Sequence, residues 1–311
     1  MPEFVISLNS SHVVQNGLNN HLKFPFKAGG FKVPRGSKMA ISNAVIPYSF
    51  FNVSGGQYNN NSLGYYWPNG TFNLVSFPDG FYTTDSINNF LQQYMIAKFQ
   101  YLTNTTTGQN MYFIQIVTNQ TYYSNQILLF PVPMTLPAGF TAPSGFPYAV
   151  SSATTPQVNF PSTKSMGSLL GFTTGTYPNT PTTLSNNVLS NSIPNACPVN
   201  AIVLRSNLIN NNCGQISDML DSFAINNTSF GSNITYQPPW AKYVSIVEGV
   251  YSSINITLVD QNLQNIKFND NNLLLSILIV TPEKHQEITY ETPTPTPPPN
   301  KLLINSDTLF R

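Results

Sequence analysis

Residues 273–280 read LLLSILIV, so only one of these eight side chains is polar. This is the longest apolar run in the chain, and a membrane span needs roughly 18 apolar residues. We therefore expect no membrane span. A short, nearly continuous apolar run is typical of a strand enclosed in a sandwich of sheets. We predict an inner strand over residues 272–280 that is buried on both faces.

Elsewhere, apolar residues mostly alternate with polar ones, and Gly, Pro and Asn interrupt them at short intervals. Alternation with a period of two indicates strands buried on one face, and turn residues at roughly 8- to 12-residue spacing are typical of sandwiches and barrels. The sequence predicts an all-β fold. Its further strands are expected over residues 3–8, 21–26, 38–46, 63–67, 72–77, 111–118, 126–130, 201–209, 243–247 and 252–259.

One segment has a helical period instead. Its apolar side chains lie at positions i, i+3, i+4, i+7 and i+8, which is one face of a helix: Ile87, Phe90, Leu91, Tyr94 and Met95. A threonine and Asp85 suit its start, and Lys98 suits its end. We predict one inserted helix over roughly residues 84–100.

Two proline-rich segments set the predicted domain limits. Residues 131–198 are too long for an ordinary connection and are interpreted as a surface excursion. Residues 292–299 read TPTPTPPP and should form extended polyproline II. We predict one domain over residues 1–280 with long loops, then a linker and C-terminal arm over 281–311. The arm is either a frayed tail or, as we favour, an anchor to a neighbouring subunit through Leu302, Leu303, Ile304, Leu309 and Phe310.

Charge is scarce along the whole chain. Charged residues make up 8% of the 311 residues, against about 25% in ordinary domains. Between residues 99 and 204 the only charged side chain is Lys164, while Asn occurs 39 times in the chain. The 21 Phe and 16 Tyr argue against disorder, and 13 basic against 12 acidic residues argue against specific binding of nucleic acid. A neutral surface repels copies of itself little, which favours assembly.

Catalytic and metal-binding patterns are missing. The sequence has no glycine-rich phosphate loop, no Gly-x-Ser-x-Gly elbow and no zinc-type spacing of His12, His21 and His285. Asp218/Asp221 and Glu283/Glu287 are the closely spaced carboxylate pairs, and Asp218/Asp221 is interpreted as a turn or short helix with solvated acids. We predict no enzyme activity, no cofactor and no metal. The amino terminus does not resemble a secretory signal, so Cys197 and Cys213 are expected to be free thiols.

Two clusters are candidates for binding. A basic cluster without an intervening acid contains Lys23, Lys27, Lys32, Arg35 and Lys38. It suits packaged nucleic acid or an acidic partner on an inner face, or else a solvated strand edge where lysine discourages pairing. The aromatic run Tyr65-Tyr66-Trp67 suits sugar stacking, or packing in a core or interface.

Several segments together resemble a known family. They are the turn at residues 33–36, the strand AISNAVIP at 40–47, the helix entry FPDGFYTTDSINNFL at 77–91, SLLGF at 168–172, and the late run 254–280. This combination is similar to the penton, or minor capsid, proteins of virophages, polinton-like viruses and related large DNA viruses. The resemblance spans most of residues 1–280, and the helix entry is its most specific part.

The resemblance implies a single jelly roll with two four-stranded antiparallel sheets. It implies homopentamers at the fivefold vertices of an icosahedral virion. The implied partners are further copies of the chain, a double jelly-roll major capsid protein and other minor capsid proteins. Two alternatives remain open: a virion fibre, spike or carbohydrate-binding adhesion module using Tyr66 and Trp67, and a hydrolase on a jelly roll using Asp218 and Asp221.

Overall fold

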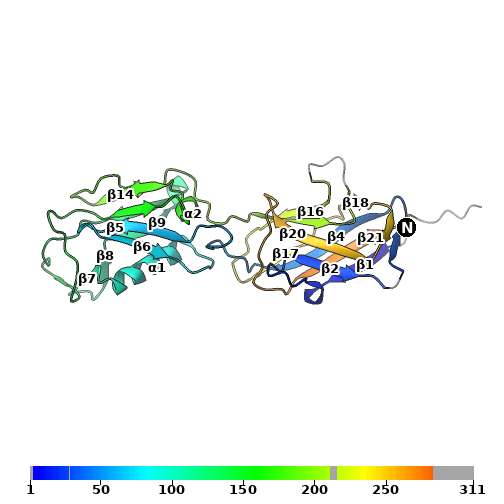
Figure 1. Ribbon diagram of the computed structural model, residues 1–311, viewed down its shortest axis with the longest axis horizontal. Helices are drawn as coiled ribbons and strands as arrows, with labels where there is room; N and C mark the ends of the chain where they lie inside the picture. The colour runs from blue at the N-terminus through cyan, green and yellow to red at the C-terminus, as the bar shows by residue number, and fades with distance from the viewer. Residues whose placement is uncertain (1–2, 28, 211–215, 283–311) are drawn as a thin grey trace, which may run out of the picture.

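The computed structural model describes residues 3–27, 29–210 and 216–282. Figure 1 shows two β-rich lobes arranged along the long axis and joined by a narrow neck. We call them the terminal lobe, residues 3–50 and 197–282, and the inserted lobe, residues 51–196. Each lobe has its own cluster of buried apolar side chains.

The terminal lobe consists mainly of two antiparallel sheets. The first has the order β1-β21-β4-β17, with bounds Glu3–Leu8, Leu274–Val280, Lys38–Pro47 and Asn233–Tyr236, and the short β18 (Val244–Ser245) also pairs with β4. The second has the order β16-β15-β20-β2, with bounds Met219–Ala224, Ala201–Ser206, Ser253–Asp260 and His21–Pro25. A small pair, β3 (Phe31–Val33) with β19 (Gly249–Tyr251), and the 3-10 turn η1 (Ser10–His12) complete the lobe. The topology is jelly-roll-like.

Strand β21 was predicted to be buried on both faces, and this prediction is wrong. Leu275, Ile277 and Ile279 are buried in the core, but Leu274 is exposed and Leu278 is half-buried. The strand is central within its sheet because β1 and β4 flank it. No third layer among the described residues covers the other face of that sheet, so burial alternates along the strand.

Aromatic stacks close the gaps between the edges of the two sheets. At the β16/β17 edge the rings of Phe223 and Tyr236 stack with centroids 4.2 Å apart. At the β1/β2 edge a chain of rings runs from Phe24 through Phe26 and Phe31 to Phe4, with neighbouring centroids 5.7, 5.0 and 6.3 Å apart. Such aromatic pairs contribute beyond their buried area, so they help to hold the sheets together.

The inserted lobe has three further sheets. Their orders are β13-β12-β5-β6 (Gly175–Tyr177, Gln157–Phe160, Ser62–Tyr66, Phe72–Ser76), β14-β10-β9 (Asn186–Leu189, Ser124–Leu129, Ile114–Asn119) and β11-β7-β8 (Phe140–Thr141, Tyr101–Asn104, Asn110–Tyr112). The 3-10 turn η2 (Gln120–Tyr122) and two helices, α1 (Thr84–Ala97) and α2 (Gly167–Leu170), complete it.

The predicted helix is confirmed as α1, three residues shorter at its end. The Thr83 side chain accepts a hydrogen bond from the Ser86 backbone N–H, which satisfies a free donor of the first turn. Ile87, Leu91 and Met95 are fully buried. The helix packs on β9, where the Asn88 side chain accepts a hydrogen bond from the Ile116 backbone N–H.

Residues 131–198 do not behave as a surface excursion. They contribute nine of the 24 buried residues in the apolar cluster of the inserted lobe, including Phe146, Val158, Phe160 and Phe172. The SLLGF segment forms α2, and Gly171 ends it in the left-handed conformation with φ of 84°. The apolar residues of this segment are too scattered among Pro and Thr to show a period, yet they converge in space. The predicted boundary at residues 280/281 remains a prediction, because residues 283–311 lie outside the described part.

The neck is where the chain leaves and re-enters the terminal lobe. Asn52 is 1% exposed and ties together three segments. Its Nδ2 donates to the backbone carbonyls of Tyr82 and Ala196, at 2.8 Å each, and its Oδ1 accepts from the Tyr82 N–H at 2.7 Å. Beside it, the Phe81 ring stacks on Phe230 of the terminal lobe with centroids 4.6 Å apart. The helix-entry segment therefore belongs to the inserted lobe but also packs, through Phe81, on the terminal lobe.

We predict that Asn52→Ala lowers the free energy of unfolding by about 1–3 kcal/mol, because buried backbone groups at the neck lose their partners. Urea denaturation followed by fluorescence measures this. Asn89→Ala, the same change at an exposed position of α1, is the matched control and should cost little. Equal effects of the two substitutions would show that the hydrogen bonds of Asn52 at the neck contribute little to stability.

Candidate assembly surfaces

The scarcity of charge belongs mainly to the inserted lobe. Residues 51–196 contain four of the chain's 25 charged side chains: Asp79, Asp85, Lys98 and Lys164. Asp79 lies at the neck, where its carboxylate accepts hydrogen bonds from the Gly55 N–H and the Ser54 hydroxyl, each at 2.8 Å. These bonds lower the pKa of Asp79. Most of the surface of this lobe therefore consists of amides, hydroxyls and apolar groups.

One face of the inserted lobe combines exposed apolar side chains with half-buried amides. Tyr66, Phe72 and Leu74 are 40, 46 and 51% exposed, and the first two rings lie 4.8 Å apart. Strand pairing places Gln157 opposite Tyr66 and Asn159 opposite Gly64 on the same side of the sheet. We call the surface formed by Tyr66, Phe72, Leu74, Gln157 and Asn159 the β5–β6 face. A Cβ at Gly64 would lie 2.5 Å from the Phe72 ring, so glycine makes room for that ring.

The run Tyr65-Tyr66-Trp67 is not one sugar-stacking platform. Tyr65 and Trp67 are buried in the core of the inserted lobe. The Tyr65 hydroxyl donates to Gln100, and the Trp67 indole N–H donates to the Pro147 carbonyl at 2.6 Å. Strand alternation points neighbours to opposite faces, so only Tyr66 faces outward. The pairing of Tyr66 with Trp67 as a sugar site is therefore wrong.

The basic cluster lies on the terminal lobe. Its five side chains are all exposed, and they come from β2, β3, the start of β4 and the turns between them: Lys23, Lys27, Lys32, Arg35 and Lys38. Among the described residues the ion pairs are Arg205–Asp218 and Lys242–Asp221. None of the five cations is therefore paired with a described acid.

The arm residues Leu302, Leu303, Ile304, Leu309 and Phe310 lie outside the described residues, as do Cys213, Glu283 and Glu287. Cys197 is a free thiol. Its sulfur lies 3.2 Å from the Tyr48 hydroxyl and donates to the Val199 carbonyl at 3.0 Å. Burial and the contact with Cys197 raise the pKa of Tyr48.

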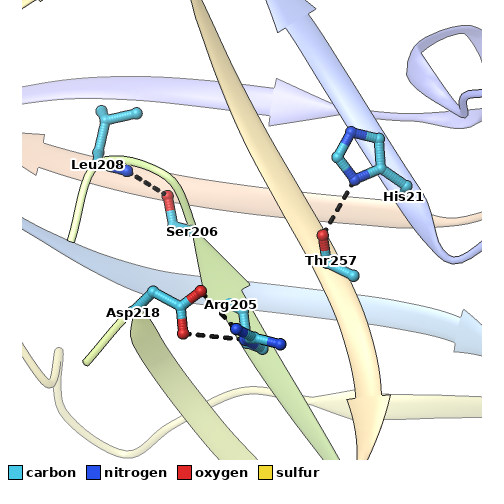
Figure 2. Close-up of polar contacts among 6 residues, drawn as sticks. All are labelled: His21, Arg205, Ser206, Leu208, Asp218 and Thr257. Atoms are coloured by element: carbon cyan, nitrogen blue, oxygen red, sulfur yellow. Dashed lines mark hydrogen bonds and ion pairs between the residues drawn. The ribbon is translucent and has the colours of Figure 1, made fainter. Parts of the chain in front are cut away.

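Asp218 and Asp221 form ion pairs and hydrogen bonds at strand β16, an edge strand of the sandwich. Figure 2 shows Asp218 receiving the Arg205 side chain, with Nε–O distances of 2.9 and 3.1 Å. Asp221 is buried and accepts from the Tyr236 hydroxyl at 2.8 Å and from Lys242 Nζ at 3.2 Å. Their polar partners are different, since Asp218 pairs with Arg205 while Asp221 bonds to Tyr236 and Lys242. These contacts give both carboxylates a structural role at the edge of the sheet.

The described histidines have local partners. His12 accepts from the Asn9 N–H at 3.1 Å and completes the cap of η1. His21 contacts the Thr257 hydroxyl at 3.0 Å (Figure 2), and burial, with nearby Lys23, lowers the pKa of His21. Within residues 3–27, 29–210 and 216–282, no three His, Cys, Asp or Glu side chains gather as a metal site would require. In the same residues, no helix has the length and apolarity to cross a membrane.

No family model matches the chain, and no curated protein matches it by sequence. Two solved structures of virophages are similar in shape. The mavirus penton protein has a TM-score of 0.42 and 10% identity, covering 91% of this chain and 100% of that one. A chain of the Sputnik virophage has a TM-score of 0.39 and 12% identity, covering 90% and 98%. Neither similarity assigns a role to a residue of this chain.

Neither the neck nor the β5–β6 face is predictable from the sequence. Alternation along residues 62–66 and 72–76 indicates two faces for each strand, but it does not tell which face a second layer covers. Asn52 is one of 39 asparagines, and nothing in the sequence distinguishes it.

We predict that Tyr236→Phe lowers the free energy of unfolding by about 1.5–3 kcal/mol, because the buried Asp221 carboxylate loses a hydrogen-bond donor. Urea denaturation measures the change. Tyr122→Phe removes a hydroxyl from an exposed side chain and is the control. A Tyr236→Phe variant as stable as the control would contradict the structural role of this network.

Proposed function

We propose that the chain is a structural virion protein, a penton subunit that forms homopentamers at the fivefold vertices of an icosahedral capsid. The observation that carries this is the pair of sheet orders in the terminal lobe, β1-β21-β4-β17 and β16-β15-β20-β2. Numbering these eight strands along the chain gives 1-8-3-6 and 5-4-7-2, the order of a single jelly roll. Jelly rolls are characteristic of viral capsid proteins and also of lectins.

The inserted lobe supports assembly over an isolated role. It lies between the third and fourth strands of this jelly roll, and it carries four charges over residues 51–196. A ring of five copies needs two different surfaces on each subunit that fit each other. Neutral faces of amides and apolar groups, such as the β5–β6 face, meet this need without placing like charges side by side.

The remaining candidate residues fit into this proposal. The basic cluster would face the inside of the shell, where it would meet nucleic acid or an acidic partner. The arm would contact a neighbouring subunit through Leu302, Leu303, Ile304, Leu309 and Phe310. The partners would be the major capsid protein and other minor capsid proteins, and the protein would reside in the virion. The alternative is a virion fibre or spike, which predicts a different number of copies.

We predict that the full chain forms pentamers at high concentration and that Leu74→Lys weakens them at least tenfold, because it adds five like charges to the ring. Sedimentation velocity over a concentration series measures both. Leu184→Lys introduces the same charge at an exposed leucine outside the β5–β6 face and should have no effect. A trimer would favour the fibre alternative, and a monomer at all concentrations or equal effects of the two substitutions would contradict this interface.

We also predict that a chain ending at Pro282 folds normally but enters particles less efficiently, because it lacks the apolar arm. Its thermal unfolding should match that of the full chain, and quantitative mass spectrometry of purified particles measures incorporation. A chain with serine at the five arm positions separates loss of the apolar side chains from loss of length. Normal incorporation of both variants would refute the role of the arm.

A further inference from the structure

A cleft of about 620 Å³ lies where the two lobes meet. The inserted lobe contributes Gln57, Tyr58 and Asp79, and the terminal lobe contributes Asp260, Asn262 and Lys267. Gln57 Nε2 donates to the Asn265 carbonyl at 3.1 Å, which connects the two walls. The volume is that of roughly 20 water molecules and falls within the range of small-molecule sites.

Asp260 brings a half-satisfied carboxylate to this cleft. Its side chain is buried, with 6% exposure of the residue. Oδ1 accepts from the N–H groups of Asn262 and Gln264, both at 2.8 Å. Oδ2 has no hydrogen-bond donor among the described residues. Oδ2 is not among the fully buried side-chain atoms that lack a partner, so it is open to the cleft and free to accept a hydrogen bond from a ligand.

Tyr58 contributes a hydrogen-bond donor to the same cleft. Its hydroxyl oxygen accepts from Gln57 Nε2 at 3.2 Å, but its own proton has no acceptor among the described residues. Burial, and then the negative charge of Asp260, raise the pKa of Tyr58 to about 12. The hydroxyl therefore keeps its proton at neutral pH. The cleft therefore offers one neutral donor, the Tyr58 hydroxyl, and one acceptor, Asp260 Oδ2.

A hydroxyl group of a ligand can bond to both Asp260 Oδ2 and the Tyr58 hydroxyl, because it donates one hydrogen bond and accepts others. The rest of the lining favours a neutral ligand with several such groups. Asp79 and Asp260 outnumber Lys267 among the charged lining residues, which disfavours an anionic ligand. Amides such as Gln57 and Asn262 add donors and acceptors, and the Tyr58 ring adds an apolar surface.

We propose that this cleft binds a carbohydrate, one of whose hydroxyl groups donates to Asp260 Oδ2 and accepts from the Tyr58 hydroxyl. The site differs from the sugar site that the sequence suggested, since it contains neither Tyr66 nor Trp67. It is independent of the number of copies in an assembly. A virion protein with such a cleft would contact glycans through the junction of its lobes.

Saturation-transfer difference NMR on the full chain tests the proposal with galactose, mannose, N-acetylglucosamine and lactose as probes. We expect transfer to at least one sugar. Tyr58→Phe keeps the ring and removes the donor, while Asp260→Asn keeps an oxygen for the two backbone N–H groups and replaces the free acceptor. Asp260→Asn should weaken binding about tenfold or more, as expected for a lost hydrogen bond to a charged group, and Tyr58→Phe should weaken it about two- to tenfold, as expected for a neutral one.

Tyr66→Phe is the matched control on the β5–β6 face and should leave binding unchanged. Thermal unfolding of each variant identifies any that fails to fold, and the two cleft variants then serve as independent tests. The proposal is overturned if no sugar shows transfer, which would leave the cleft to water. It is also overturned if both folded variants bind normally or if Tyr66→Phe abolishes binding. Sedimentation of the same samples reports the oligomer separately.

Discussion

The neck is the constraint on which the rest of the structure depends. The chain leaves the terminal sandwich after β4 and returns to it at β15, so two passages must cross one narrow junction without opening the core. Asn52 connects the outgoing passage to the returning one at Ala196 and to the helix entry at Tyr82. Because an amide both donates and accepts, one side chain satisfies all three backbone groups. The two cores can then pack separately.

Local structure could be predicted from the sequence better than the pairing of strands that are distant in the chain. The threonine cap and the period of α1 are local features, and β4, β20 and β21 are long enough to be predicted as strands from sequence. Strand β12 (Gln157–Phe160) has only two apolar residues and is too short for a period to be visible. The pairing of β4 with β17 joins residues nearly 190 positions apart, and no local pattern encodes it. For the same reason the sequence could not reveal two cores, since both halves are similarly apolar.

The candidate binding residues show the same difference between local features and grouping in space. The basic cluster is contiguous in sequence and proved to be exposed, whereas Tyr65 and Trp67 were grouped with Tyr66 although alternation sends them inward. The scarcity of charge was visible at once, but its meaning depended on the fold. It belongs to a lobe with its own core, so a neutral surface is a property of one structural unit. This makes association through that lobe the central physical claim.

A cryo-electron microscopy reconstruction of a particle vertex, computed without imposed symmetry, tests that claim most directly. The account predicts five copies of this chain around the vertex axis, with the jelly-roll lobes in the ring and neighbouring inserted lobes in contact. Density for the chain away from the vertices, or three copies around one axis, would contradict it. So would a ring of five in which the inserted lobes do not touch.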